Sequence, residues 1–366
     1  MNKRKHIRRV CRRVAAVTAG ITILAAAYPL ACGVFGTRVA LAVVALRQPG
    51  AAVSWLEQSL FPAAQTVVPP AALAPMEEPL GDTTAVDIPT AAPVGDTPPI
   101  TMISPPGNKG DGGKILTKKM DTGNRTHGIA TLNRSGTAVD VAAALKRQLT
   151  LKWADTDAPQ VLILHTHTTE PYMTYDAGYY NAADRTRTKD HTKTVCAVGE
   201  AIKMSLAAAG IAAIHDTTVH DSPVYSGAYT RSAVTAQNYL KQYPTIKVVL
   251  DIHRDAVMEN GAMVKPTATV DGKKAAQMML ITGVVDTTAL PHPQWRDNLT
   301  FAARLQQALD GISPDLMRPL QTVASRYNQH LSPGWVLVEV GSEGNTVAEA
   351  VYSGQILGRT VAKLLN

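Results

Sequence analysis

Histidines and glutamates that can hold a metal ion recur at three places in the sequence. His165, His167 and Glu170 lie within the run His-Thr-His-Thr-Thr-Glu. His253 opens a His-Arg-Asp run, and Glu339 is the one charge in the apolar run 335–340. Zinc in hydrolases takes three ligands from His, Asp and Glu and keeps a fourth position for water. The metal lowers the pKa of that water to about 7, and a nearby carboxylate takes its proton as it attacks a carbonyl. These residues predict a zinc hydrolase.

Apolar runs precede all three places and are typical of buried strands. Residues 161–164, 247–252 and 335–338 are rich in Val, Leu and Ile, which a strand tolerates when both faces of its sheet are covered. Ligands of open α/β sheets bind at the carboxyl ends of such strands. We therefore expect the three strands to deliver these side chains to one edge of a sheet.

The sequence does not decide which of His165 and His167 binds the metal. Residues i and i+2 of a strand face the same way, so His165 and His167 can both reach one ion if the strand continues. If the strand breaks at His165, only one of the two binds the ion, and the other lies behind the ligands. Asp251 or Asp255 can orient an imidazole from behind. Glu339 needs a metal or a partner such as Arg231, because a buried carboxylate is costly when unpaired.

Strands alternate with helices along the second half of the chain. This order predicts an α/β fold, a twisted and mainly parallel sheet with helices on both faces. The expected strands are 115–120, 128–132, 161–164, 211–214, 248–252, 278–285 and 336–340, and the expected helices are 139–151, 194–209, 228–242, 299–309 and 345–365. The polar, tyrosine-rich segment 172–190 has no period and is expected to be a loop that contacts substrate.

The N-terminal third predicts an anchor and a tether. The net charge is +7, and seven of the positive residues lie within the first 13: Lys3, Arg4, Lys5, Arg8, Arg9, Arg12 and Arg13. The remainder is close to neutral, which argues against a nucleic-acid partner. Residues 14–46 begin with an uncharged apolar run long enough to span a bilayer, and the preceding charges predict that everything after it is exported. A Pro/Ala-rich linker that cannot form a core fills residues 47–113, and the folded domain is expected at 114–366.

Cysteine usage adds little to this assignment. The chain has three cysteines, Cys11, Cys32 and Cys196, and their wide separation excludes a disulfide framework. Cys196 lies in an apolar, helical context and is expected to be a buried small hydrophobe.

Together, these motifs resemble the stage II sporulation protein P family. The resemblance extends over about residues 158–366 and rests on the following runs: His-Thr-His-Thr-Thr-Glu-Pro-Tyr at 165–172, His-Asp at 215–216, His-Asp-Ser-Pro-Val-Tyr at 220–225, Tyr-Thr-Arg-Ser at 229–232, Asp-Ile-His-Arg-Asp at 251–255, and Glu-Val-Gly at 339–341 followed by Asn345. The first block and the His-Arg-Asp block are specific in combination. A membrane anchor and a loose linker also match the layout of the family.

The resemblance implies a membrane-anchored, zinc-dependent peptidoglycan hydrolase with an amidase_3-like fold. The activity would be that of an N-acetylmuramoyl-L-alanine amidase, with endopeptidase activity also attributed to the family. His165 and His253 match its essential histidines, Glu170 its carboxylate ligand and Glu339 its general base, while His167 stays an alternative ligand. The side chains expected to contact substrate are Arg254, Arg231 and Tyr172.

The resemblance also implies partners and a location. The partners would be peptidoglycan, the membrane, and the stage II sporulation proteins D (SpoIID, a lytic transglycosylase) and M (SpoIIM, a membrane protein). The protein would act from the mother-cell membrane during engulfment, with its C-terminal domain facing the space between the mother cell and the forespore.

Two other functions fit parts of the same pattern. Metallohydrolases built on (β/α) barrels also carry His-x-His after their first strand, but the folded segment is short for a barrel of about 250 residues. A non-catalytic wall-binding scaffold is the second alternative, and loss of the carboxylates would favour it. Glu170 and Glu339 are both present.

Overall fold

The computed structural model describes residues 100, 102–108, 110–123, 125 and 128–365. The predicted basic tail at 1–13, the predicted membrane segment at 14–46 and most of the predicted linker at 47–113 lie outside these residues. Within the described ranges, no helix combines the length and the apolar character needed to cross a membrane.

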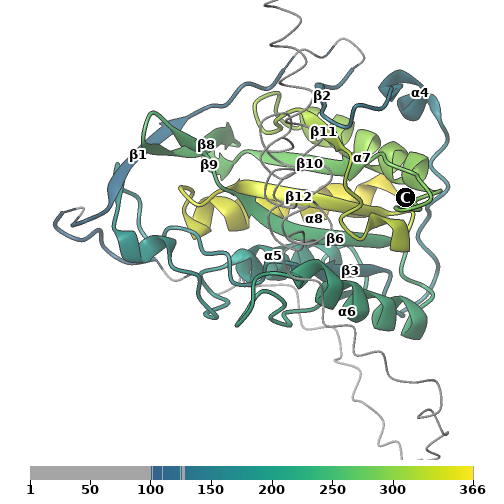
Figure 1. Ribbon diagram of the computed structural model, residues 1–366, viewed down its shortest axis with the longest axis horizontal. Coiled ribbons are helices and arrows are strands. Elements are labelled where there is room, and N and C mark those ends of the chain that lie inside the picture. Colours follow the sequence, from purple (N-terminus) through teal and green to yellow (C-terminus); the bar gives the residue numbers. More distant parts are fainter. Residues whose placement is uncertain (1–99, 101, 109, 124, 126–127, 366) are drawn as a thin grey trace, which may run out of the picture. The chain divides into compact units, whose positions relative to one another are not determined.

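Seven strands of the described residues form the main sheet, and most of them are labelled in Figure 1. In spatial order they are β2 (Thr131–Asn133), β11 (Leu320–Val323), β10 (Met278–Gly283), β12 (Trp335–Ser342), β6 (Val248–Asp255), β3 (Val161–Leu164) and β5 (Ala213–His215). The pair β10–β12 is antiparallel, and the other neighbouring pairs of this sheet are parallel. The prediction of a mainly parallel sheet is therefore confirmed. The single antiparallel pair nevertheless makes it a mixed sheet.

A second, smaller sheet explains the reversed strand. It consists of β4 (Tyr179–Tyr180), β1 (Gly113–Lys118), β8 (Ala262–Val270) and β7 (Met258–Glu259), with β9 (Lys273–Ala276) paired to β8. Parallel neighbours need a long crossover, usually a helix. Between β6 and β10 the chain forms β7, β8 and β9 instead of a helix, and β10 runs antiparallel to β12.

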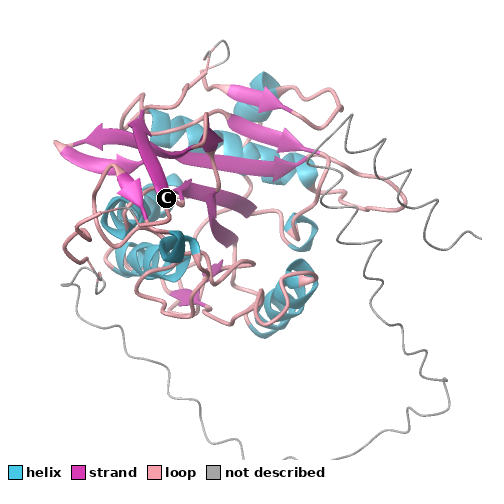
Figure 2. Ribbon diagram, turned by 60° about the vertical axis from the view of Figure 1, so that its left-hand side comes forward, coloured by secondary structure: helices cyan, strands magenta, loops and turns pink. Residues whose placement is uncertain are grey.

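Helices cover both faces of the main sheet, as predicted (Figures 1 and 2). They are α4 (Val141–Lys146), α5 (Val195–Ala207), α6 (Ala228–Gln242), α7 (Trp295–Asp310) and α8 (Val347–Leu364), with short 3₁₀ turns η2 (Ala182–Arg185) and η3 (Gln329–Leu331). On one face, Ile163, Leu250 and Val338 pack with α4, α5, α7 and α8. On the opposite face, Leu162 and Val249 pack with Ala236 of α6. Side chains alternate between these two cores because a strand has a period of two.

The helix predicted at 139–151 is shorter than expected. It ends at Lys146 because Arg147 is extended, with φ −64° and ψ 136°. Leu149 and Leu151 still pack against the large core, but from an extended chain rather than a helix.

The folded part of the chain begins before Lys114. The backbone N–H of Ile103 donates a hydrogen bond of 2.7 Å to the carbonyl of Thr174. Tyr179 donates its hydroxyl proton to the carbonyl of Pro106. Residues 102–108, which the sequence assigns to the linker, are thus attached to the loop that follows β3.

Candidate active site

The ends of β3, β6 and β12 bring the predicted site residues together. These strands are neighbours (Figure 1), and His253 of β6 is the direct Cα partner of Glu339 of β12. Both side chains lie on the α6 face, because their neighbours Ile252, Val338 and Val340 pack in the core on the other face. His253 and Glu339 therefore lie side by side on the sheet.

Two residues of the His-Thr-His-Thr-Thr-Glu run complete the group. The Nδ1 atom of His253 lies 3.7 Å from Oε2 of Glu170. The ring of His167 lies edge-on to that of His253, with the ring centroids 5.2 Å apart. Tyr229, from the first turn of α6, stacks on His253 at 6.4 Å. All three of His167, Glu170 and His253 are buried.

Neighbouring groups fix the orientation of His253 and Glu170. The Nε2 atom of His253 makes an ion-pair contact of 3.0 Å with Oδ1 of Asp251, although the contact is not aligned as a hydrogen bond. Asp251 itself accepts hydrogen bonds from the backbone N–H and the hydroxyl of Thr166. Glu170 accepts from the backbone N–H of Arg254 at 3.2 Å and from Arg187 at 3.4 Å. Asp251 thus has the orienting position predicted for it, whereas Asp255 pairs with Arg318 instead.

His165 does not join this group. Its Nδ1 atom lies 3.0 Å from the carbonyl of Ile252, which only accepts, so that nitrogen carries the proton. Its Nε2 atom lies 2.9 Å from Nε2 of His215, whose Nδ1 contacts Glu200 of α5. The ring is fully buried on the α5 side of the sheet. Both nitrogens are occupied, and His165 holds the end of β3 to the end of β6 beneath the site.

Helix α5 approaches this histidine pair so closely that only glycine fits. A Cβ atom at Gly199 would lie 2.4 Å from Nε2 of His215 and 2.8 Å from Nε2 of His165. We expect Gly199→Ala to lower the free energy of unfolding by about 1–3 kcal/mol, although alanine favours a helix by about 1 kcal/mol. Urea denaturation measures this change. Gly178→Ala, where the added atom meets nothing within 4 Å, is the control, and equal effects at both positions would contradict the packing.

Burial and mutual charge shift the pKa values of the group. Burial lowers the pKa of His167 to about 4, against the opposing charge of Glu170. Burial also acts to lower the pKa of His253, but the charge of Asp251 and its contact outweigh burial and raise it to about 10. Burial raises the pKa of Glu339 to about 8, although the charge of His253 opposes this.

A backbone irregularity follows Glu339 and explains the glycine and asparagine of that motif. The register between β12 and β6 shifts between Glu339 and Ser342, where Gly341 has φ +66°. A Cβ atom there would lie 2.5 Å from Oδ1 of Asn345. The same oxygen accepts the N–H of Ser342 at 2.9 Å. Bulges of this kind end regular pairing and direct side chains next to functional sites.

The side chains expected to contact substrate have other partners. Tyr172 is buried and donates its hydroxyl proton to the carbonyl of Val340. Arg254 is buried and donates its Nε proton to the carbonyl of Pro171. Arg231 bonds to the carbonyls of His220 and Val224 rather than to Glu339.

Two side chains at the site were not singled out from the sequence. Arg187 donates to Asp221 at 2.5 Å and to Glu170 at 3.4 Å. Tyr225 stacks on His167, and its hydroxyl lies 3.0 Å from Nε2 of that histidine. Tyr225 is the last residue of the run His-Asp-Ser-Pro-Val-Tyr, so its motif could have marked it as a site residue. Its contact with His167, 58 residues away, could not be predicted from that motif.

The side chains of His167, Glu170 and His253 are of the types that bind zinc, although they do not surround a common point. Among the described residues, no three His, Cys, Asp or Glu side chains form a ready metal site. Two buried atoms in this group, Nδ1 of His167 and Oε2 of Glu339, nevertheless have no hydrogen-bond partner, while Nε2 of His253 has only its contact with Asp251. Native proteins seldom leave such atoms unsatisfied. Two imidazoles and a carboxylate are also the ligand types of catalytic zinc.

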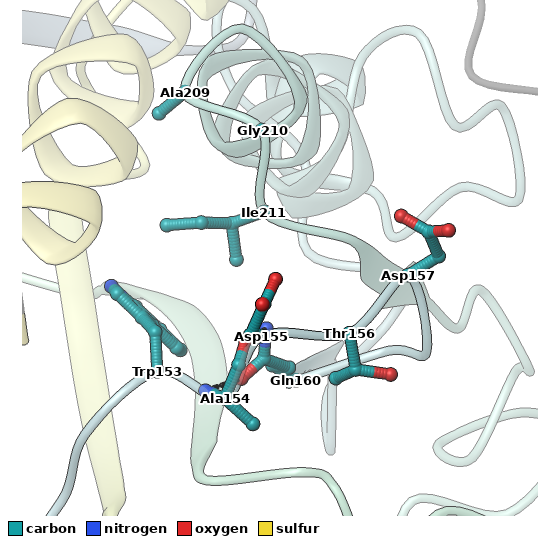
Figure 3. Close-up of a pocket in the computed structure, with 9 residues that line it drawn as sticks. All are labelled: Trp153, Ala154, Asp155, Thr156, Asp157, Gln160, Ala209, Gly210 and Ile211. Atoms are coloured by element: carbon teal, nitrogen blue, oxygen red, sulfur yellow. Dashed lines mark hydrogen bonds between the residues drawn. The ribbon is translucent and has the colours of Figure 1, made fainter.

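A separate pocket lies at the opposite end of β3. Figure 3 shows it beside Trp153, Asp155 and Gln160, which precede that strand, and Ile211, which precedes β5. Its volume is about 410 Å³. It belongs to the amino ends of the parallel strands, away from the group described above, and takes no part in that site.

Comparison with known proteins gives the family. A family model described as stage II sporulation protein P matches residues 113–362. No match was found among curated proteins. Among solved structures, the CwlD amidase of Clostridioides difficile, in complex with the GerS lipoprotein, has 11% identity and a TM-score of 0.37, covering 56% of this chain and 98% of its own.

Two further structures are similar at the same level. The N-acetylmuramyl-L-alanine amidase Ami1 of Mycobacterium smegmatis has 14% identity and a TM-score of 0.33, covering 58% of this chain and 99% of its own. A putative N-acetylmuramoyl-L-alanine amidase of Neisseria meningitidis has 15% identity and a TM-score of 0.29, covering 56% and 93%. The family model alone spans well over half of the sequence, so the chain belongs to the stage II sporulation protein P family, as its motifs predicted.

Proposed function

We propose that this protein is a zinc-dependent N-acetylmuramoyl-L-alanine amidase that cleaves peptidoglycan. The observation that carries the proposal is the gathering of His167, Glu170 and His253 beside Glu339, from three strand ends that are far apart in the sequence. Carboxylates and imidazoles are rarely buried together without a metal or a catalytic role. A non-catalytic scaffold would not need to retain them.

His167, Glu170 and His253 would hold the metal. His167 is favoured over His165 because its Nδ1 atom is buried without a partner, whereas both ring nitrogens of His165 are occupied. Zinc bound here would supply a Lewis acid and lower the pKa of a water molecule to about 7. Asp251 would keep the proton of His253 on Nε2 and so direct Nδ1 toward Glu170.

Glu339 would act as the general base. It lies next to His253 on the same face of the sheet, and its Oε2 atom is buried and free to take a proton. A base works best when its pKa is near the working pH, and burial moves that of Glu339 in this direction, to about 8. The bulge at Gly341 would fix where this carboxylate points.

The rest of the proposal concerns location and finer specificity. An anchor at 14–46 would hold the enzyme at the mother-cell membrane, facing the wall between mother cell and forespore, with SpoIID and SpoIIM as partners. Its support is the basic and apolar pattern of the first 46 residues together with membership in the family. Cleavage of peptide cross-links would be a second activity of the same site.

The test is digestion of purified peptidoglycan with the full-length chain. We expect stem peptides with free N-terminal L-alanine, identified by mass spectrometry, and glycan strands without peptides. A chelator should abolish cleavage, and one equivalent of zinc should restore it. Shortened cross-links with the muramoyl amide intact would assign the endopeptidase activity instead. Full activity in the metal-free protein would overturn the zinc assignment.

A further inference from the structure

Tyr225 covers the exposed side of His167. It belongs to the segment between β5 and α6, and 43% of its surface is exposed. Its ring is nearly parallel to that of His167, with an interplanar angle of 11° and centroids 4.4 Å apart. The phenol oxygen lies 3.0 Å from Nε2 of His167. The tyrosine therefore contacts the ring face of this histidine and also one of its two nitrogens.

The hydrogen bond satisfies the form of the histidine that can bind a metal through Nδ1. A neutral imidazole carries one N–H, and the phenol oxygen can accept it. A metal at Nδ1, the buried nitrogen that has no hydrogen-bond partner, requires a bare lone pair there, so the proton must lie on Nε2. Without the tyrosine oxygen, that buried N–H would lose its acceptor, which is costly. With the proton on Nε2, Tyr225 accepts it, and the lone pair on Nδ1 is left for another ligand.

Arg187 holds Tyr225 in this position. Its guanidinium carbon lies 4.7 Å from the centroid of the Tyr225 ring, a distance at which the cation is attracted to the aromatic face. The same guanidinium donates to Asp221 and Glu170. A chain of contacts thus runs from Glu170 through Arg187 and Tyr225 to His167, and both ends of this chain are proposed metal ligands.

We propose that Tyr225 is a positioning residue for the metal centre, whose hydroxyl keeps the proton of His167 on Nε2 and presents Nδ1 to the metal. This inference rests on the proposed zinc site. It adds an outer partner for His167 that corresponds to Asp251 for His253. Groups that orient a metal-binding histidine in this way typically contribute 10–100-fold to metal affinity.

The decisive variant is Tyr225→Phe in the full-length protein. It keeps the ring on His167 and the contact with Arg187 and removes only the hydroxyl. We expect the zinc dissociation constant, measured by competition with a chromogenic chelator, to rise about 10–100-fold. The control is Tyr352→Phe, whose hydroxyl donates to the carbonyl of Val270 away from the site. That variant should bind zinc as tightly as the unaltered protein.

A second measurement reads the proton directly. In the zinc-loaded, full-length protein with ¹⁵N-labelled histidine, we expect His167 to be protonated on Nε2 and the resonance of that N–H to shift in the Tyr225→Phe variant, where it loses its acceptor. Unchanged zinc affinity and an unchanged nitrogen spectrum in this variant would overturn the role of Tyr225. If the unaltered protein itself takes up no zinc, the proposed function fails instead, so the two failures are distinguishable.

Discussion

Glu339→Gln is expected to reduce peptidoglycan cleavage by about 10²–10⁴-fold while zinc stays bound. Glutamine has nearly the same shape but cannot take up a proton, and the transfer of a proton to a positioned base contributes about this factor to a rate. Glu339 is not among the proposed ligands, so one zinc per chain should remain. The measurements are the release of stem peptides from purified peptidoglycan and the metal content of the same sample.

A glutamate outside the site provides the control for this experiment. Glu259 of β7 pairs with Lys118 and is partly exposed. Glu259→Gln removes the same charge and should leave the rate within about twofold, since exposed ion pairs contribute little. Retained cleavage in Glu339→Gln would remove this residue from the mechanism. Loss of zinc from that variant would instead make Glu339 a ligand.

The second large effect separates the two histidines of the His-Thr-His-Thr-Thr-Glu run. In His167→Ala, we expect zinc affinity to fall by more than the 10–100-fold that an outer partner contributes, because a ligand is lost. In His165→Ala, we expect zinc still to bind at one per chain. Its unfolding free energy should fall by about 1–3 kcal/mol for each buried partner left unsatisfied, namely Ile252 and His215.

Zinc titration and urea denaturation of both variants give the two quantities. Activity alone would not separate them, because displacement of β3 from β6 also disturbs the site. His191→Ala, in the loop between η2 and α5, is the control for a histidine outside both groups. The reverse result, with zinc lost in His165→Ala and kept in His167→Ala, would contradict the assignment of the ligands.

The strands that carry the site could be predicted from the sequence, but the direction of the side chains could not. The runs at 161–164 and 335–340 are strands as expected, because long stretches of Val, Leu and Ile favour few alternatives. His165 and His167 were expected to share a face only if β3 continued. It ends at Leu164, so the rule for alternating side chains no longer applies to them.

The strand β8 was missed for a related reason. Lys265 and Pro266 interrupt its apolar pattern, which is atypical of an inner strand. Lys265 is nevertheless buried, since Asp176 and Glu349 each pair with it at 2.8 Å. Both partners are more than 80 residues away in the sequence. The roles of Tyr225 and Arg187 likewise depend on contacts that no local pattern encodes, with partners 58 and 34 residues away in the sequence.

The attachment of residues 102–108 to the loop after β3 has a mechanical consequence. A pull on the preceding chain would load the hydrogen bonds of Ile103 and Pro106 before it reached β1. Those bonds end on Thr174 and Tyr179, and the neighbouring Tyr175 bonds to Asp184 in the turn that leads to Arg187. Tension along residues 102–108 would therefore be passed to residues 174–184, beside the proposed metal site.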